Sequence, residues 1–144
     1  ASATPGNPLL DPCLVGLWRE TSNLQDIQID GAPRRFTSSG AIQRFAADGT
    51  AAVDYGTANV RTGTAGGDHW EFVTTGNLSY HYQTNQGSIL YSDAHADGSI
   101  LRKRNGSVYD RVPLTASITP ERYTCTPDSL REFGENYTIE LLRM

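Results

Sequence analysis

The alternation of apolar and polar residues near the start of the chain predicts a buried β-strand. Between residues 13 and 21, Leu14, Gly16 and Trp18 fall on one face and the residues between them on the other. This is the period of two that an extended strand imposes. Gly16 leaves space beside the large indole, as is needed where another segment approaches closely. We therefore expect this strand to form the floor of an all-β fold, with Trp18 inside.

The rest of the chain continues as short apolar-polar runs broken by turn residues. Asp30-Gly31, Asp48-Gly49 and Asn105-Gly106 are strong hairpin signals. We expect Gly76 and Ala96-Asp97-Gly98 to separate further strands. The remaining expectations are a loose glycine-rich connection over 56–67 and a single helical turn at 119–121.

Consecutive short strands joined by tight turns are typical of a meander. The pattern predicts an all-β protein, an antiparallel up-and-down β-barrel of about eight to ten strands, because closure removes the exposed edges of short strands. A two-sheet sandwich is the alternative. We expect one domain over residues 13–144, preceded by a linker or export-derived segment over residues 1–12 that is small, polar and broken by proline.

Composition narrows the class of partner. The chain has 144 residues and a formal net charge of -4, which argues against nucleic acid and anionic membranes. No apolar run reaches the ~20 residues of a membrane-spanning helix. A small molecule in the interior, or a protein contacted through the loops, is the partner that remains.

The sequence contains two cysteines, Cys13 and Cys125, near opposite ends of the chain. A disulfide between them would fasten the first strand to the last section. Together with the export-like amino terminus, this pair indicates a secreted or extracellular protein. Tethering at the cell surface through the first residues is an alternative. Two free buried thiols in a cytosolic protein are the alternative.

Several short motifs carry a family resemblance. Gly16-Leu17-Trp18 resembles the Gly-x-Trp signature of the lipocalins and their calycin relatives. The segments 11–18, 48–50 and 122–125, with a threonine-rich final hairpin, are similar to secreted lipocalin-like domains of high-GC Gram-positive bacteria. The resemblance implies a closed barrel end where a late arginine packs across the tryptophan, and Arg143 matches that arginine by location.

Motifs for metal binding or catalysis are weak. The chain has three histidines; His69 and His81 could meet across an antiparallel pair, but no third metal ligand is indicated. Gly-x-Ser-x-Gly and phosphate-binding loops are absent. We expect carboxylates such as Glu20 and Glu71 to face water. The sequence therefore predicts no metal, no cofactor and no catalytic residue, and it favours a protein that is not an enzyme.

Aromatic residues are the remaining candidates for a site. We assign most of seven such residues to inward strand faces and add Tyr91 and Tyr109 to them as candidates. A tyrosine has an apolar ring with a polar tip, which suits an amphipathic or aromatic ligand. The seven residues are Phe45, Trp70, Phe72, Tyr80, Tyr82, Tyr91 and Tyr109. The expected function is a secreted binding module for a small hydrophobic or amphipathic ligand. The alternatives are an extracellular sensor or interaction domain with a filled barrel, in which these rings only fill the core, and a barrel-type isomerase or cyclase.

Overall fold

The computed structural model describes residues 9–144 as ten antiparallel strands, and no helix occurs in that range. The strands are β1 (Gly16–Ile29), β2 (Ala32–Ser38), β3 (Ile42–Phe45), β4 (Thr50–Ala65), β5 (Asp68–Asn85), β6 (Ser88–Arg104), β7 (Ser107–Pro113), β8 (Glu121–Cys125), β9 (Ser129–Phe133) and β10 (Tyr137–Arg143). The predicted all-β class and strand number are confirmed. With no helix in 9–144, that part of the chain also offers none that could cross a membrane.

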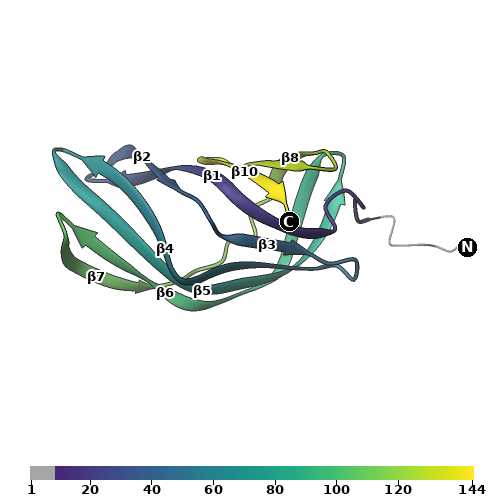
Figure 1. Cartoon of the computed structure of the whole chain (residues 1–144), viewed down its shortest axis with the longest axis horizontal. Coiled ribbons are helices and arrows are strands. Elements are labelled where there is room, and N and C mark those ends of the chain that lie inside the picture. Colours follow the sequence, from purple (N-terminus) through teal and green to yellow (C-terminus); the bar gives the residue numbers. More distant parts are fainter. Residues whose placement is uncertain (1–8) are drawn as a thin grey trace, which may run out of the picture.

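Hydrogen bonds between neighbouring strands form a ring. β1 pairs with β10 on one side and with β2 and β3 on the other, and β4 pairs with both β2 and β3. From β4 the ring continues through β5, β6, β8 and β9 back to β10. β7 lies outside this path and pairs with the last part of β6. Figure 1 shows the elongated molecule, with β4, β5 and β6 running along most of its length.

The long strands β4, β5 and β6 contradict three predicted breaks. The segment 56–67 is mostly strand, and neither Gly76 nor Gly98 forms a turn. Instead Gly76 pairs with Gly56 on one side and Gly98 on the other. A Cβ atom on Gly76 would lie 1.9 Å from the Asp97 carbonyl oxygen. Glycine is needed here because adjacent strands approach too closely for a side chain.

The segment that connects β7 to β8 also differs from prediction. Residues 114–120 contain no helical turn, and Glu121 is the first residue of β8. The side chain of Glu121 is buried. On this side of β6, residues 88–89 pair with β8 and residues 99–104 pair with β7. The segment connects the two across the stretch of β6 that lies between them. A non-helical connection therefore takes the place of the expected helical turn, and it leads into β8 so that the Glu121 carboxyl group lies in the interior.

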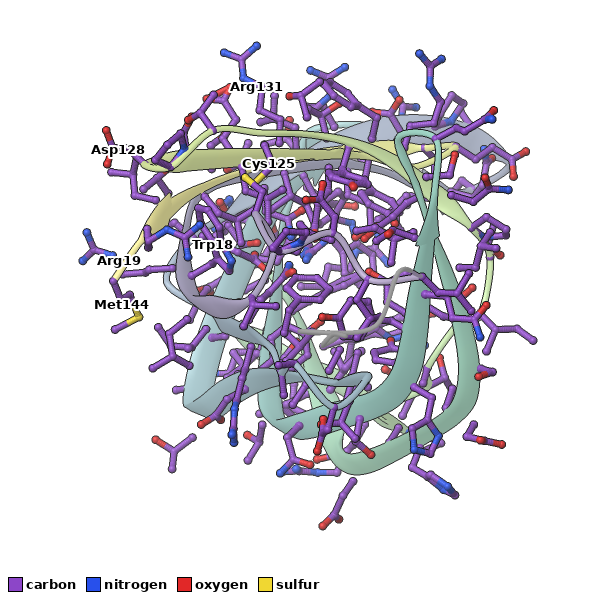
Figure 2. All side chains as sticks on the ribbon, turned by 90° about the vertical axis from the view of Figure 1, so that its right-hand side faces the viewer. Trp18, Arg19, Cys125, Asp128, Arg131 and Met144 are labelled. Carbon is purple, nitrogen blue, oxygen red and sulfur yellow. A yellow bond between two sulfur atoms is a disulfide. The ribbon has the colours of Figure 1, made fainter. Side chains whose placement is uncertain are left out.

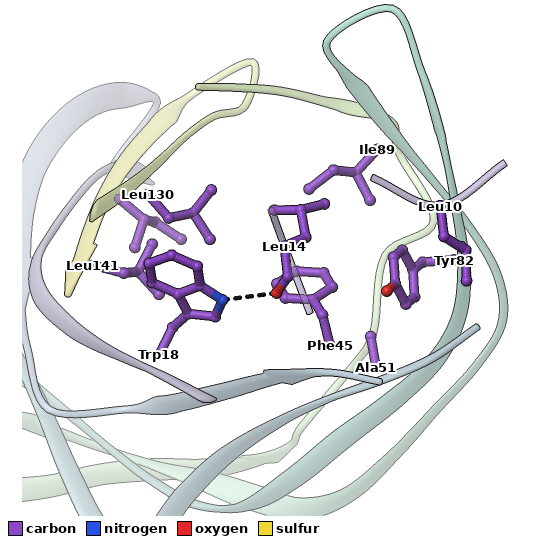
Figure 3. Close-up of a cluster of buried hydrophobic side chains, with 10 residues drawn as sticks. Leu10, Leu14, Trp18, Phe45, Ala51, Tyr82, Ile89, Leu130 and Leu141 are labelled. Carbon is purple, nitrogen blue, oxygen red and sulfur yellow. Dashed lines mark hydrogen bonds between the residues drawn. The ribbon is translucent and has the colours of Figure 1, made fainter. Parts of the chain in front are cut away.

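A large apolar cluster fills one end of the ring. This Trp18 cluster comprises Leu10, Leu14, Trp18, Phe45, Ala51, Tyr82, Ile89, Leu130, Ile139 and Leu141. Leu14 and Trp18 are completely buried, whereas Leu17 is 45% exposed, so the predicted phase of the first strand is confirmed. The Trp18 indole Nε1 donates a hydrogen bond of 2.8 Å to the Leu14 carbonyl (Figure 3). In Figure 2, Trp18 points into the ring while Arg19 points away from it.

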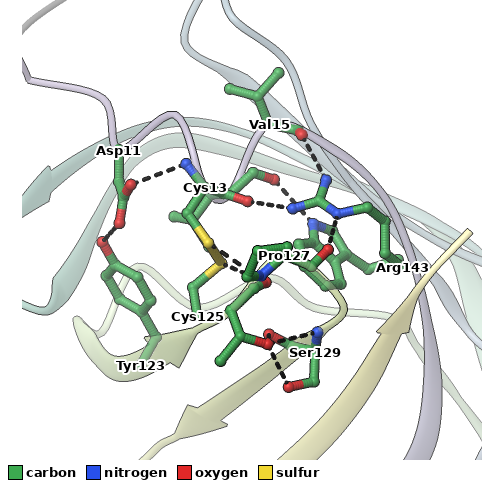
Figure 4. Close-up of a disulfide and its surroundings, with 11 residues drawn as sticks. Asp11, Cys13, Val15, Tyr123, Cys125, Pro127, Ser129 and Arg143 are labelled. Atoms are coloured by element: carbon green, nitrogen blue, oxygen red, sulfur yellow. Dashed lines mark hydrogen bonds between the residues drawn. A yellow bond between two sulfur atoms is a disulfide. The ribbon is translucent and has the colours of Figure 1, made fainter.

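Arg143 covers the Trp18 ring from the last strand. Its guanidinium carbon lies 4.1 Å from the centre of the indole. The same guanidinium donates to the carbonyl oxygens of Cys13, Val15 and Pro127 at 2.6, 2.9 and 2.6 Å (Figure 4). A Cβ atom on Gly16 would lie 2.7 Å from Arg143 Nη1, and Gly16 has a φ of 143°. Only glycine therefore fits beneath this arginine.

Cys13 and Cys125 form a disulfide beside Arg143, with Cα atoms 6.2 Å apart. The packed chain begins before the predicted boundary at residue 13: Leu10 belongs to the Trp18 cluster, and Asp11 accepts a hydrogen bond of 2.6 Å from Tyr123. Of the predicted linker 1–12, residues 1–8 lie outside the described residues. The disulfide therefore joins two segments that are also held by packing and hydrogen bonds.

A smaller apolar cluster lies at the other end of β5. This Trp70 cluster consists of Phe36, Ala65, Trp70 and Phe72. Trp70 and Tyr82 of the Trp18 cluster both lie on β5, separated by roughly 40 Å at the usual rise of a strand. The two apolar clusters therefore leave a middle section of the ring between them.

Candidate functional site

The middle of the ring contains a cavity of about 300 Å³. Its polar lining includes Glu20, Asn23, Gln43, Tyr55, Arg61, Tyr80, Tyr91, Glu121, Glu132 and Tyr137. Apolar residues, among them Val53 and Leu78, complete the wall. Lining residues from segments 115–120 and 134–136 are mostly exposed, so the cavity meets solvent between these two segments. Its volume is at the lower end of the range for small-molecule sites.

The polar wall is a second layer of inward-facing residues next to the Trp18 cluster. Glu20 follows Trp18 by two residues on β1, and Glu132 follows Leu130 by two on β9. The same step from buried cluster residues on β3, β5, β6 and β10 leads to Gln43, Tyr80, Tyr91 and Tyr137. Since a strand repeats every two residues, all these side chains point into the ring.

Gln43 connects two buried carboxyl groups. Its Nε2 donates to Glu20 Oε2 at 3.0 Å and to Glu132 Oε1 at 2.9 Å. Asn23 Nδ2 donates to the other Glu20 oxygen at 3.0 Å. The carboxyl group of Glu132 also shares a hydrogen bond with that of Glu121. One acceptor remains: Asn23 Oδ1 is buried without a hydrogen-bond partner among the described residues. Such atoms are costly in a folded protein unless a further group satisfies them.

A third buried carboxyl group, Glu121, is held by two tyrosines. The hydroxyl of Tyr91 donates to Glu121 Oε1 and that of Tyr137 donates to Oε2. Tyr91 lies on β6, which is the neighbour of β8, and Tyr137 lies on β10, which is the neighbour of β9. The Tyr91 ring also packs against Tyr80, with ring centres 4.8 Å apart. Glu121 therefore lies at the centre of an aromatic wall.

Burial raises the pKa of all three carboxyl groups. For Glu20, Glu121 and Glu132 the loss of solvent is the largest cause, and the neighbouring carboxyl groups raise the pKa of Glu121 and Glu132 further. The increase is large for Glu132, which is 1% exposed. Burial also raises the pKa of Tyr80 to about 12, so its hydroxyl stays protonated at neutral pH. The cavity thus combines neutral hydroxyl groups with carboxyl groups that resist ionisation.

One guanidinium shares the cavity. Burial lowers the pKa of Arg61, while the nearby Tyr55 and Glu20 counteract this effect. The positive charge of Arg61 in turn lowers the pKa of Glu20. The positive charge of Arg61 therefore offsets part of the cost of ionising Glu20.

The seven predicted aromatic residues occupy four different environments. Tyr80 and Tyr91 line the cavity. Phe45 and Tyr82 instead pack edge to face in the Trp18 cluster. Trp70 and Phe72 belong to the Trp70 cluster, and Tyr109 is 56% exposed and covers the edge of Trp70. The aromatic set is therefore not one continuous pocket.

The expectation that carboxylates face water is wrong for Glu20, Glu121 and Glu132, which are 3%, 5% and 1% exposed. A sequence signal for two of them existed. Glu20 continues the inward phase of Leu14, Gly16 and Trp18, and Glu132 is in phase with Leu130. Gln43 is likewise in phase with Phe45, which the sequence assigns to the interior. Glu121 and Arg61 have no comparable signal, because Glu121 was expected in a helical turn and Arg61 in a loose connection.

The histidines do not form a site. His69 and His81 lie on the same strand, β5, so they cannot pair across two strands as the sequence suggested. His81 is exposed and its Nδ1 lies 2.8 Å from Asp93 Oδ2. Within residues 9–144 no group of three or more histidine, cysteine or acidic side chains is arranged to hold a metal ion.

Comparison of the chain with protein-family models, with curated proteins and with solved structures finds no match. The lipocalin-like resemblance therefore stays a prediction from the short motifs of the sequence. The function has to be argued from the cavity and its residues.

Proposed function

We propose that the chain is a lipocalin-like barrel that binds a small amphipathic molecule in its interior. The observation that carries this proposal is the cavity of about 300 Å³ in the middle of a ring whose two ends are filled. A ring that served only as a rigid support for its loops would gain stability from an apolar filling at this level as well. The polar lining favours a ligand with hydrogen-bonding groups, that is, the amphipathic one of the two kinds expected from the sequence.

The chemistry of the wall supports an amphipathic rather than a purely apolar ligand. Tyr80 and Tyr91 provide ring surface, and Leu78 and Val53 provide aliphatic surface. The unpaired acceptor Asn23 Oδ1 would be satisfied by a donor group of the ligand. Binding of such a molecule stabilises the folded state by RT ln(1 + L/Kd), where L is the free ligand concentration, so the stabilisation grows with the logarithm of that concentration once it exceeds Kd.

A thermal-shift screen with small neutral, cationic and anionic molecules tests this proposal. We expect at least one class to raise Tm in a saturable manner. Val53→Phe, which places a larger side chain in the cavity wall, should abolish the shift. Val60→Phe is the matched control, because Val60 is 40% exposed on the same strand and does not line the cavity. A screen without any saturable shift would contradict the proposal.

A second candidate function is proton transfer on the bound molecule, as in an isomerase or cyclase. It is favoured by the pair formed by Glu121, whose carboxyl oxygens accept from two tyrosines, and Glu132, whose pKa is strongly raised. One group could accept a proton while the other donates one. NMR in D₂O of a ligand from the screen tests this function: wild type should exchange a carbon-bound hydrogen and Glu132→Gln should not. If wild type shows no exchange, the proton-transfer function is contradicted and ligand binding remains as the proposed function.

We also propose that the protein works in an oxidising compartment outside the cytoplasm. The disulfide between Cys13 and Cys125 supports this location, since such bonds persist where thiols are not kept reduced. The intact mass of the protein isolated from its natural host, measured after alkylation without reduction, should show no modified thiol. Two alkylated cysteines would contradict this location.

A further inference from the structure

Arg61 presents unused hydrogen-bond donors to the cavity. It lines the cavity from β4. In the part of the chain that the structure describes, its guanidinium takes part in no ion pair and no side-chain hydrogen bond, and it interacts with Tyr55 and Glu20 only through their charges at longer range. A guanidinium has five N–H donors and no acceptor. Arg61 therefore needs an acceptor that the surrounding side chains do not supply.

Two further polar groups of the cavity wall also have unused hydrogen-bonding capacity. The hydroxyl of Tyr55, on the same strand as Arg61, has no hydrogen-bond partner among residues 9–144. Asn23 lines the cavity from β1 and is 5% exposed, yet its Oδ1 is a buried acceptor without a donor in the same range. The wall therefore combines a cationic donor, a hydroxyl group and an unpaired acceptor.

The register of the strands places Asn23 and Arg61 at the same level of the ring. Asn23 pairs with Ser38 of β2, and Thr37 of β2 pairs with Thr62 of β4. The next position in that register sets Ser38 beside Arg61. The Cα atoms of Asn23 and Arg61 are therefore roughly 10 Å apart, which is twice the usual spacing of strands. Since the arginine side chain is long, one small molecule can reach both groups.

The charges around this part of the cavity favour a neutral molecule. Three buried carboxyl groups, those of Glu20, Glu121 and Glu132, share the cavity with one guanidinium. An anion would offer an acceptor to Arg61 but would add negative charge to an interior that is already acidic, and a cation at this place would be repelled by Arg61. A neutral acceptor pairs with the guanidinium without either cost.

We infer that the cavity binds a neutral carboxamide with an apolar body, whose carbonyl oxygen accepts from Arg61 and Tyr55 and whose N–H donates to Asn23 Oδ1. This inference rests on the proposed binding function and specifies its ligand. A carboxamide carries a strong acceptor and a donor on one small planar group, so it satisfies both kinds of unused group in the wall. The apolar body lies against Leu78 and Val53.

Isothermal titration of the wild-type chain with three probes of nearly equal size tests the inference. Benzamide has the carbonyl and the N–H, acetophenone has a methyl group in place of the NH₂ group, and benzoate has the carbonyl as part of an anion. We expect benzamide to bind about tenfold more tightly than acetophenone, because only benzamide offers a donor to the buried acceptor. Benzamide should also bind about tenfold or more tightly than benzoate, because the acidic interior repels an anion.

Two variants locate the two contacts. Arg61→Met removes the guanidinium and should weaken benzamide and acetophenone alike by about tenfold, because both lose a charge-assisted hydrogen bond to the carbonyl. Asn23→Leu removes the acceptor and should weaken benzamide by about tenfold while leaving acetophenone within about twofold. Arg19→Met is the matched control for Arg61→Met, since Arg19 points away from the ring (Figure 2) and does not line the cavity. It should leave both affinities unchanged.

Each of these measurements can contradict the inference by itself, so a variant that fails to fold leaves the others decisive. Equal affinity of wild type for benzamide and acetophenone, or tightest binding of benzoate, would overturn it. An equal loss in Arg19→Met and Arg61→Met, or an unchanged ratio of benzamide to acetophenone affinity in Asn23→Leu, would do the same. If none of the three probes binds while the thermal-shift screen finds another ligand, the carboxamide is wrong and the proposed binding function stands; if the screen also finds none, both fail.

Discussion

The Trp18 cluster and the cavity are built by the same strands, with inward positions only two residues apart, yet they follow opposite rules. In the cluster the polar atoms are satisfied: the Trp18 indole donates to Leu14, and Arg143 donates to three carbonyl oxygens. In the cavity three buried carboxyl groups lie without ion pairs among the described residues, and the acceptor Asn23 Oδ1 lies without a donor. Stability explains the first arrangement. The second costs stability, which is typical of a site retained for function.

Among changes near the Trp18 cluster, removal of the disulfide should reduce the free energy of unfolding most. Replacing both cysteines by serine should reduce the free energy of unfolding by about 4–5 kcal/mol in the chain-entropy model for a loop this long. Urea denaturation measures the loss. Ligand-induced shifts in Tm should persist in the folded fraction, because neither cysteine lines the cavity. A loss below about 1 kcal/mol would mean that packing alone holds the two segments.

Trp18→Ala should cost about 3–5 kcal/mol, because it opens a large space in a fully buried cluster and removes the surface on which Arg143 packs. Chemical denaturation again measures the change. Leu17→Ala is the control on the outer face of the same strand and should cost less than about 1 kcal/mol. Similar losses in the two variants would contradict the inward phase of this strand.

On the cavity side a substitution should stabilise. Glu132→Gln keeps the acceptor for Gln43 and removes the ionisable group, so it should raise the free energy of unfolding by about 1–3 kcal/mol at neutral pH. The raised pKa means that the folded protein retains a proton that the unfolded chain releases above the ordinary glutamate value of 4.5. Wild-type stability therefore falls as pH rises above that value, and the advantage of the variant grows over the same range.

Denaturation of wild type and Glu132→Gln between pH 4 and pH 8 measures this difference. Glu140→Gln should show no comparable gain, since its side chain is 46% exposed. A constant difference between Glu132→Gln and wild type at every pH would rule out the raised pKa as its cause.

Replacing tyrosine by leucine at positions 80 and 82, two successive inward positions of β5, gives the smallest changes in the free energy of unfolding but compares the cavity with the Trp18 cluster directly. Tyr82→Leu should cost about 1–2 kcal/mol, because Tyr82 is 2% exposed, packs on Phe45 and donates to the Ala46 carbonyl at 2.9 Å. Tyr80→Leu should cost less than about 1 kcal/mol, because its ring faces the cavity. Ligand binding should weaken in Tyr80→Leu alone. Thermal shift with a ligand from the screen separates the two, and equal effects on binding would remove the boundary between cluster and cavity.

The fold could be predicted largely from local patterns. The alternation around Trp18 and the hairpin signals at Asp30-Gly31 and Asn105-Gly106 identify strands and turns, because period and positive φ are local properties. Gly76 and Gly98 misled the prediction. A glycine required by the close approach of a neighbouring strand has the same sequence signature as a glycine in a turn.

The candidate site was harder to predict because it depends on strands far apart in the chain. Tyr80 was found from its phase and Tyr91 was added to the aromatic set without one, but Glu121 and Glu132 were assigned to solvent on the general preference of carboxylates. Their burial follows from the register of β8 and β9 in the ring, which a single sequence does not encode locally. Continuing the phase of Trp18 to Glu20 would have indicated one of the three.

The pairing of β1 with β10 also has a kinetic consequence. The hairpins of β4, β5 and β6 form between neighbours in the chain, whereas Trp18 and Arg143 come from its two ends. Bringing distant strands together is the slow part of folding because the loop-closure entropy is lost before contacts form. In the oxidised chain the disulfide holds these ends near each other from the start. Refolding of the oxidised protein should therefore be faster than that of the reduced protein, with ring closure as the step that the bond accelerates.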